Sequence, residues 1–158
     1  MSKILLYTQI KADKHLVFDL SRSIDLHKIS TRHTNETAIA GKTQGLILMD
    51  ETVTWRARHF GIYQYMTVKI TVYNRPDYFT DEMVSGPFKH FKHEHRFISQ
   101  KEGTLMVDVF EYTSPFGLLG KLFDVIILKR YMEKLLQKRN LIIKDFAETH
   151  KWKNVLKS

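Results

Sequence analysis

The sequence predicts an α+β fold in which a curved antiparallel sheet packs against one long helix near the C-terminus. Two patterns of apolar residues lead to this prediction. From about Gly41 to Tyr112, apolar and polar residues alternate with a period of two, and turn residues divide the region into five or six strands. After Pro115 the apolar residues are spaced three and four apart as far as Phe146, which predicts a helix. The inner face of the sheet needs an apolar partner, and this helix can supply it.

The first part of the chain predicts one strand followed by two short helices. Residues 3–11 (KILLYTQIK) read as the strand, and no Gly or Pro interrupts them. Residues 12–23 read as the first helix, where apolar residues recur three and four apart. Ser23 can cap a second helix, because its hydroxyl can accept a hydrogen bond from a free amide of the first turn.

The long helix carries an apolar stripe on a basic background. Arg139 is the one interruption of the stripe. A helical pattern of more than about 25 residues is unusual in a globular domain, so we expect a break near Asn140. The stripe consists of Leu118, Leu122, Val125, Leu128, Met132, Leu135, Ile142 and Phe146.

Length and composition indicate one globular domain. The chain has 158 residues, which is the size of a single domain, and we place this domain at 1–158 with a core of about 3–146 and a basic tail at 147–158. The absence of cysteine excludes disulfides, cysteine-bound zinc and a thiol nucleophile, and fits a cytoplasmic protein. No apolar run has the length of a membrane span or of a signal-peptide core.

The net charge of +8 is concentrated toward the C-terminus. Residues 119–158 contain ten Lys or Arg and four Asp or Glu. A solvated basic helix face is the usual outcome of such a pattern, so we expect no nucleic-acid partner. Trp152 lies between Lys151 and Lys153, an arrangement that suits weak contact with a membrane surface, although we expect the end of the tail to fray. The oligomeric state stays open.

Alternation assigns the faces of the strands. In residues 90–97 the charged Lys92, Glu94 and Arg96 share one face and must be solvated, so the opposite face points inward. That inward face carries Phe91, His93, His95 and Phe97. By the same reasoning, the inward residues of the neighbouring strands are Val53, Trp55, Ala57, His59, Met66, Val68, Ile70, Val72, Met106, Asp108, Phe110 and Tyr112.

This apolar interior therefore contains polar side chains that need partners. Each unpaired polar group in a core costs about 1–3 kcal/mol, so these groups pair with one another, with water or with a ligand. His93 and His95 lie about 6.6–6.8 Å apart on one face, and with His59 or Asp108 as a third ligand they could hold zinc or iron. We expect instead satisfied core histidines, with no metal and no cofactor.

Three segments, taken in order, resemble the START/SRPBCC superfamily, the group that is birch-pollen-allergen-like and polyketide cyclase/dehydrase-like. They are residues 51–61 (ETVTWRARHFG), residues 86–97 (GPFKHFKHEHRF) and residues 115–120 (PFGLLG). The bacterial ligand-binding SRPBCC branch is the most similar, and the resemblance covers about residues 3–146. It implies the helix-grip fold: a curved seven-stranded antiparallel sheet around a long C-terminal helix, with two short helices after the first strand.

The same resemblance implies a function. It implies that an internal cavity between the sheet and the C-terminal helix binds an apolar small molecule that is lipid-, steroid- or polyketide-like. Because the superfamily also contains enzymes, the alternative is a cyclase or dehydratase that uses His95 and Asp108 for general acid–base catalysis. The facing of the strand that carries Met83 stays open. The expected ligand-binding residues are Trp55, His59, Met83, Phe91, His93, His95, Asp108, Phe110 and Tyr112.

Overall fold

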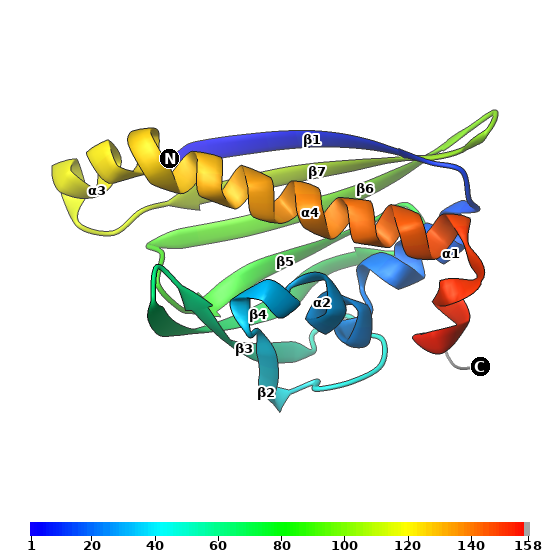
Figure 1. Ribbon diagram of the computed structural model, residues 1–158, viewed down its shortest axis with the longest axis horizontal. Helices are drawn as coiled ribbons and strands as arrows, with labels where there is room; N and C mark the ends of the chain where they lie inside the picture. The colour runs from blue at the N-terminus through cyan, green and yellow to red at the C-terminus, as the bar shows by residue number, and fades with distance from the viewer. Residues whose placement is uncertain (157–158) are drawn as a thin grey trace.

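The structure is a computed structural model that describes residues 1–156, and it confirms the predicted α+β fold (Figure 1). The strands are β1 (Ser2–Ile10), β2 (Thr37–Gly41), β3 (Thr52–His59), β4 (Ile62–Asn74), β5 (Tyr78–Ser85), β6 (His90–Gln100) and β7 (Gly103–Thr113). The helices are α1 (Lys14–Ser21), α2 (Ile24–Ser30), α3 (Gly117–Phe123) and α4 (Lys129–Glu148). The shorter turns are η1 (Arg32–Thr34), the π-helical η2 (Asp124–Leu128) and η3 (His150–Asn154).

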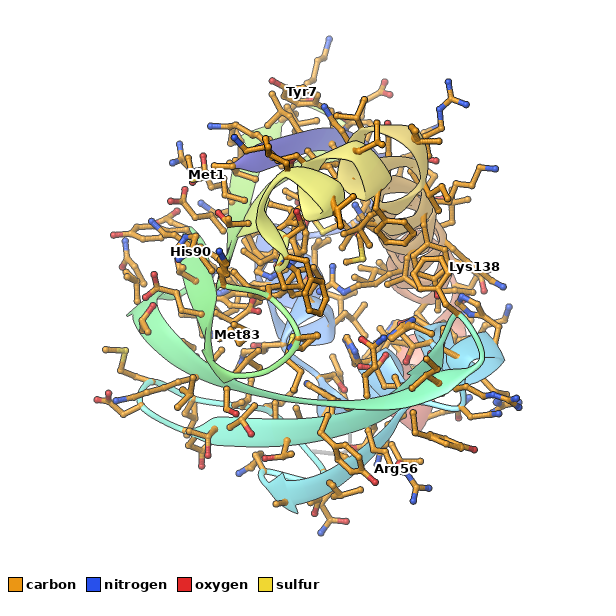
Figure 2. All side chains as sticks on the ribbon, turned by 90° about the vertical axis from the view of Figure 1, so that its left-hand side faces the viewer. Met1, Tyr7, Arg56, Met83, His90 and Lys138 are labelled. Carbon is orange, nitrogen blue, oxygen red and sulfur yellow. The ribbon has the colours of Figure 1, made fainter. Side chains whose placement is uncertain are left out.

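The seven strands form one antiparallel sheet in the order β1-β7-β6-β5-β4-β3-β2. Each strand from β2 to β6 pairs with the next along the chain, and β1 pairs with β7. Figure 2 shows the sheet curving beneath the helices. Helix α4 runs along the inner face, and α1 and α2 cover one end of the sheet (Figure 1). This arrangement is the helix-grip fold that the sequence resemblance implies.

Both short helices begin at side-chain caps. The Asp13 carboxylate accepts a hydrogen bond from the amide of His15 at the start of α1. Ser23 Oγ accepts from the amide of Leu26 at the start of α2, as predicted. Each cap satisfies an amide that has no partner within its helix, so each helix has a defined first turn.

The predicted strand faces are correct except at one position. Met106, Asp108, Phe110 and Tyr112 are all at most 1% exposed, so this face of β7 points inward. The prediction for Val72 is wrong, because its side chain is 37% exposed. The pairing of β4 with β5 shifts its register between Ile70 and Val72. One extra residue in a strand exchanges the two faces beyond it, and alternation alone does not reveal where this happens.

The predicted apolar stripe of the long helix is wrong in its first half. Leu118, Leu122 and Val125 are exposed, and α4 continues through Asn140 without the expected break. The irregularity lies earlier, in the π turn η2, where Asp124 is buried and accepts hydrogen bonds from Ser2 and Tyr112. A π turn adds a residue and changes the phase of the helix, so the residues before it turn outward. The buried residues of the second half are Leu128, Met132, Leu136, Arg139, Asn140, Ile143 and Ala147.

The end of the chain is more ordered than the sequence indicates. The tail forms η3, in which Thr149 Oγ1 accepts from the amide of Lys151, and Trp152 packs against the core. Lys157 and Ser158, the last residues of the predicted tail, lie outside the described residues. Among residues 1–156, no helix has the length and apolar character of a membrane span.

We expect Tyr112→Phe to lower the free energy of unfolding by about 1–3 kcal/mol, because the buried Asp124 carboxylate loses one of its two hydrogen-bond donors. Urea denaturation of the variant and the wild type measures this loss. Tyr65→Phe is the matched control, since the Tyr65 side chain is 56% exposed. Equal stability of Tyr112→Phe and wild type would mean that the link between β7 and η2 contributes nothing.

Candidate functional site

A cavity of about 170 Å³ lies between the inner face of the sheet and α4. Most of its wall is apolar, with contributions from α2, β3 to β7 and α4. Six of the nine residues predicted to bind a ligand line this cavity, namely Trp55, His59, Phe91, His93, His95 and Phe110.

The other three predicted residues do not line the cavity. Asp108 is 1% exposed and lies behind His93 and His95. Tyr112 is fully buried, and its hydroxyl donates to Asp124. Met83 is partly buried and packs against the core. A direct contact between any of these three and a ligand stays a prediction, and the structure assigns Asp108 a position next to the histidines.

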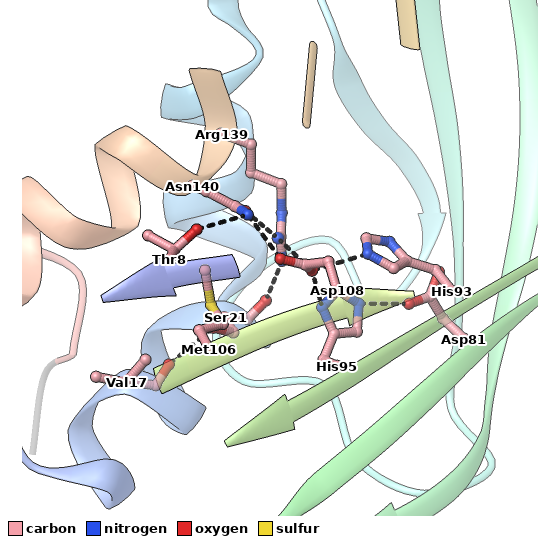
Figure 3. Close-up of polar contacts among 10 residues, drawn as sticks. All are labelled: Thr8, Val17, Ser21, Asp81, His93, His95, Met106, Asp108, Arg139 and Asn140. Atoms are coloured by element: carbon pink, nitrogen blue, oxygen red, sulfur yellow. Dashed lines mark hydrogen bonds and ion pairs between the residues drawn. The ribbon is translucent and has the colours of Figure 1, made fainter. Parts of the chain in front are cut away.

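Six side chains form a polar cluster (Figure 3), and four of them, Asp81, His93, His95 and Arg139, line the cavity. The sheet register brings three strands together here, because His95 is paired with Asp108 on β7 and His93 is paired with Asp81 on β5. His93 Nε2 lies 2.9 Å from Asp108 Oδ1, and His95 Nε2 lies 2.9 Å from Asp81 Oδ1. His95 Nδ1 lies 3.0 Å from Asp108 Oδ1, an ionic contact. The members are Asp81, His93, His95, Asp108, Arg139 and Asn140.

Helix α4 completes this cluster from the opposite side. Asn140 Nδ2 donates to Asp108 Oδ2 at 2.6 Å and also contacts Thr8 Oγ1 on β1 at 3.2 Å. The Arg139 guanidinium lies 3.7 Å from Asp108 and donates to the carbonyl of Ser21 at 3.0 Å. The residue that interrupts the predicted apolar stripe therefore points into the interior, where its charge has a partner.

The two carboxyl groups of the cluster are ionised. Burial alone would raise the pKa of Asp108, but His93 and His95 outweigh burial and hold this pKa well below its usual range. The pKa of Asp81 is lowered for the same reason, with His95 as its hydrogen-bond partner. Two anionic groups therefore lie within the interior, and the cluster must contain cations to balance them.

The pKa values of the two adjacent imidazoles, His93 and His95, are shifted in opposite directions. Burial and the neighbouring positive charge of His95 lower the pKa of His93 to about 4, so His93 is neutral at neutral pH. Burial also disfavours the charged form of His95, but the carboxylates of Asp108 and Asp81 outweigh it and raise the pKa of His95. With His95 protonated, the cations His95 and Arg139 balance the two carboxylates.

A second polar group lies at another part of the cavity wall. His27 Nε2 lies 3.3 Å from Glu36 Oε1, and His59 Nδ1 lies 2.7 Å from the hydroxyl of Tyr131. Burial raises the pKa of Glu36, but His27 and Thr31 outweigh it and lower this pKa. Burial lowers the pKa of His59. The cavity therefore has polar groups at two places and apolar surface between them.

Sequence reasoning missed several of these polar residues, among them Arg139, Asp81 and Glu36. Arg139 carried a signal, because a charge inside an apolar stripe needs a buried partner. Asp81 gave none, since polar residues also flank it on both sides in β5. Glu36 lies between two predicted elements, where an acidic residue is ordinary.

Asp81, His93 and His95 are also the residues with metal-ligand spacing in residues 1–156. One ligand atom from each lies within 4.8 Å of the other two. His59, considered from the sequence as a third ligand, is not in this group. Two histidines and one carboxylate suit zinc or iron(II). Here His93 Nε2 is hydrogen-bonded to Asp108 and His95 Nε2 to Asp81, so side chains of the protein already occupy these two nitrogens.

We expect the free energy of unfolding to fall as the pH decreases from 6.5 to about 4. Unfolded His93 takes up a proton near its ordinary pKa, whereas buried His93 does so only near the lower value, so the unfolded state binds more protons in this window. The stabilisation is complete above the ordinary pKa and is lost on acidification. Urea denaturation across this pH range measures the slope.

His93→Gln removes this titration and should flatten the slope between those two pH values. His15→Gln is the control, because His15 is exposed and should leave the slope unchanged. An unchanged slope in His93→Gln would contradict the assignment of a neutral, buried His93.

Comparison with known proteins agrees with this geometry. Residues 13–137 match the protein family described as polyketide cyclase / dehydrase and lipid transport. No curated protein sequence matches the chain.

Several solved structures have the same fold. TTHA0849 from Thermus thermophilus is 15% identical, with a TM-score of 0.72 over 92% of this chain and 99% of that one. The ginseng major latex-like protein 151 from Panax ginseng is 17% identical, with a TM-score of 0.67 over 92% and 97%. CV1439 from Chromobacterium violaceum is 9% identical, with a TM-score of 0.68 over 94% and 99%. At these identities the likeness concerns the fold, whereas the family match spans most of the chain. The chain belongs to the polyketide cyclase / dehydrase and lipid transport family, within the SRPBCC superfamily that its sequence resembles.

Proposed function

We propose that the protein binds an apolar small molecule, lipid-, steroid- or polyketide-like, in the cavity between the sheet and α4. The observation that carries this proposal is the composition of the cavity wall, which is mostly apolar and is interrupted by a smaller number of polar and charged side chains. Ligand pockets typically combine an apolar lining with a few polar groups that orient the ligand. Membership of the family supports the same reading.

The size of the cavity also favours a ligand. The cavity of about 170 Å³ is larger than the spaces that well-packed interiors leave between their side chains. An engineered apolar cavity of about 150 Å³ in another protein binds benzene, so this volume holds about one ring. A steroid-sized ligand would require the walls to move apart. An occupant would recover much of the packing that the void forfeits.

The polar cluster supports a ligand that carries an oxygen. His95 and Arg139 reach the cavity wall from the cluster, and the Arg139 guanidinium carries a positive charge there. A carbonyl, hydroxyl or carboxylate oxygen on the ligand would find donors on the Arg139 guanidinium, which has five N–H groups. Trp55 and Phe91 on the wall would contact the apolar body of the same molecule.

We expect Ala57→Phe to weaken binding of an apolar fluorescent dye by at least about tenfold, because the larger side chain fills part of the cavity. Ala57 lines the cavity from β3, whereas Ala40 on β2 is exposed. Ala40→Phe is therefore the matched control and should bind the dye as the wild type does. Circular dichroism checks that both variants fold. Unchanged binding in folded Ala57→Phe would exclude the cavity as the binding site.

One observation favours a second candidate function, proton-transfer catalysis of the cyclase or dehydratase type. His93, whose pKa is lowered, and His95, whose pKa is raised, are adjacent, with ring centroids 3.8 Å apart, and both line the cavity. Neighbouring groups with pKa values pushed apart are typical of general base and general acid pairs. Asp108 does not line the cavity, so in this candidate it holds the histidines in place.

The two candidates differ in what happens to the bound molecule. An enzyme converts a polyketide-like substrate, and a binding protein releases it unchanged, as mass spectrometry of the incubated mixture shows. In the enzyme, His95→Gln should lower the rate by about 10²–10⁴-fold while dye affinity changes little. If no conversion is found with wild type, the catalytic candidate fails.

A further inference from the structure

The helical segment that precedes α4 exposes an unusual amount of apolar surface. Six aliphatic side chains of α3 and η2 are between 45% and 83% exposed: Leu118, Leu119, Leu122, Val125, Ile126 and Ile127. We call this group the apolar end face. Single exposed apolar residues are common, but a contiguous group of this kind usually marks an interaction surface.

The local structure fixes this outward orientation. Asp124 is buried by its hydrogen bonds to Ser2 and Tyr112, and Leu128 is buried four residues later. The Cα atom of Gly120 packs against the backbone of Pro115, since a Cβ atom there would lie 1.7 Å from the carbonyl oxygen of Pro115. With these three residues pointing inward, the side chains between them must point outward. The exposure is therefore a consequence of specific contacts within the fold.

The apolar end face adjoins the cavity. Phe60 lies in the turn between β3 and β4. Its ring centroid is 5.6 Å from that of Phe123 and 4.7 Å from that of Tyr131. Phe60, Leu128 and Tyr131 also line the cavity. In Figure 1, α3 lies at the end of the molecule away from α1 and the C-terminus, and Figure 2 views the molecule from this end.

The exposed charged residues of this segment are positive. Lys121, Lys129 and Arg130 are exposed within or beside it. The single acidic residue between Phe116 and Arg130 is Asp124, which is buried. The partner that fits is therefore apolar and carries negative charge at its surface. Two copies of this face would bring like charges together, which disfavours self-association.

We propose that α3 and η2 dock on the surface of an anionic lipid bilayer. Leu118, Leu119 and the neighbouring aliphatic side chains enter the boundary between headgroups and acyl chains, and the three cations contact lipid phosphates. This surface is distinct from the C-terminal tail around Trp152. Docking rests on these exposed residues alone, whereas its use, the transfer of an apolar molecule between bilayer and cavity, rests on the function proposed above.

Co-sedimentation with lipid vesicles tests the docking. The vesicles consist of phosphatidylcholine alone or of an equal mixture of phosphatidylcholine and phosphatidylglycerol. We expect the wild type to bind the mixed vesicles more strongly, and Leu118→Ser with Leu119→Ser to weaken this binding by about a hundredfold, because two leucines no longer leave water. Both side chains are more than three-quarters exposed, so the core is unaffected.

The matched control is Ile98→Ser with Leu141→Ser, whose side chains are 50% and 62% exposed on β6 and α4. This control should bind the mixed vesicles as the wild type does. Failure of the wild type to bind, or equal binding of the Leu118/Leu119 variant, would overturn the proposal. So would a wild-type dimer that the same variant dissociates and that binds no vesicles, as light scattering reports.

Dye binding in solution separates this proposal from the proposed function. The Leu118/Leu119 variant should bind the apolar dye as the wild type does, because neither leucine lines the cavity. Loss of vesicle binding with dye binding retained in the variant supports the docking surface. Dye binding by a wild type that ignores vesicles would overturn docking alone, and vesicle binding by a wild type that binds no dye would overturn the cavity function alone.

Discussion

The rest of the structure depends on the contacts that the buried carboxylate of Asp108 makes. Its two oxygens contact His93, His95 and Asn140, and Arg139 lies 3.7 Å away. These contacts join β6 and β7 to α4, the two layers that enclose the cavity. A carboxylate in an apolar interior is stable only when its partners are held in place, so the position of α4 over the sheet and the ionisation of Asp108 depend on each other.

The same cluster explains why the interior combines two kinds of surface. The sheet curves away from α4, and aromatic and aliphatic side chains line the space between them. One polar group occurs where the strands and α4 come together at Asp108, and a second, around Glu36, lies elsewhere on the wall. Before α4, η2 turns the chain so that α3 extends away from the core with its apolar side chains outward. One molecule thus presents a mostly apolar cavity with two polar groups and, next to this cavity, an apolar outer surface.

Much of this fold follows from local patterns in the sequence. Strict alternation of charge placed His93 and His95 on the inner face, and the capping role of Ser23 followed from its position before a helix. Val72 and the first half of the long helix were wrong for a shared reason: one extra residue, in a bulge or in a π turn, changes which side of the chain faces inward. Tertiary contacts stabilise such an extra residue, as those of Asp124 do in η2, and local periodicity does not reveal these contacts. Asp81 was missed because its partner, His95, lies on another strand, and local patterns do not show such a pairing.

Native mass spectrometry of the purified protein tests the central claim, that the interior is a cavity for one apolar molecule. The protein is measured as isolated and after incubation with an excess of an apolar dye, and any molecule carried from the host is extracted into organic solvent and identified. We predict one bound molecule per chain, either an apolar compound from the host or the dye. The bare mass of the folded chain in both samples would contradict the account, since the space between the sheet and α4 would then accept no ligand.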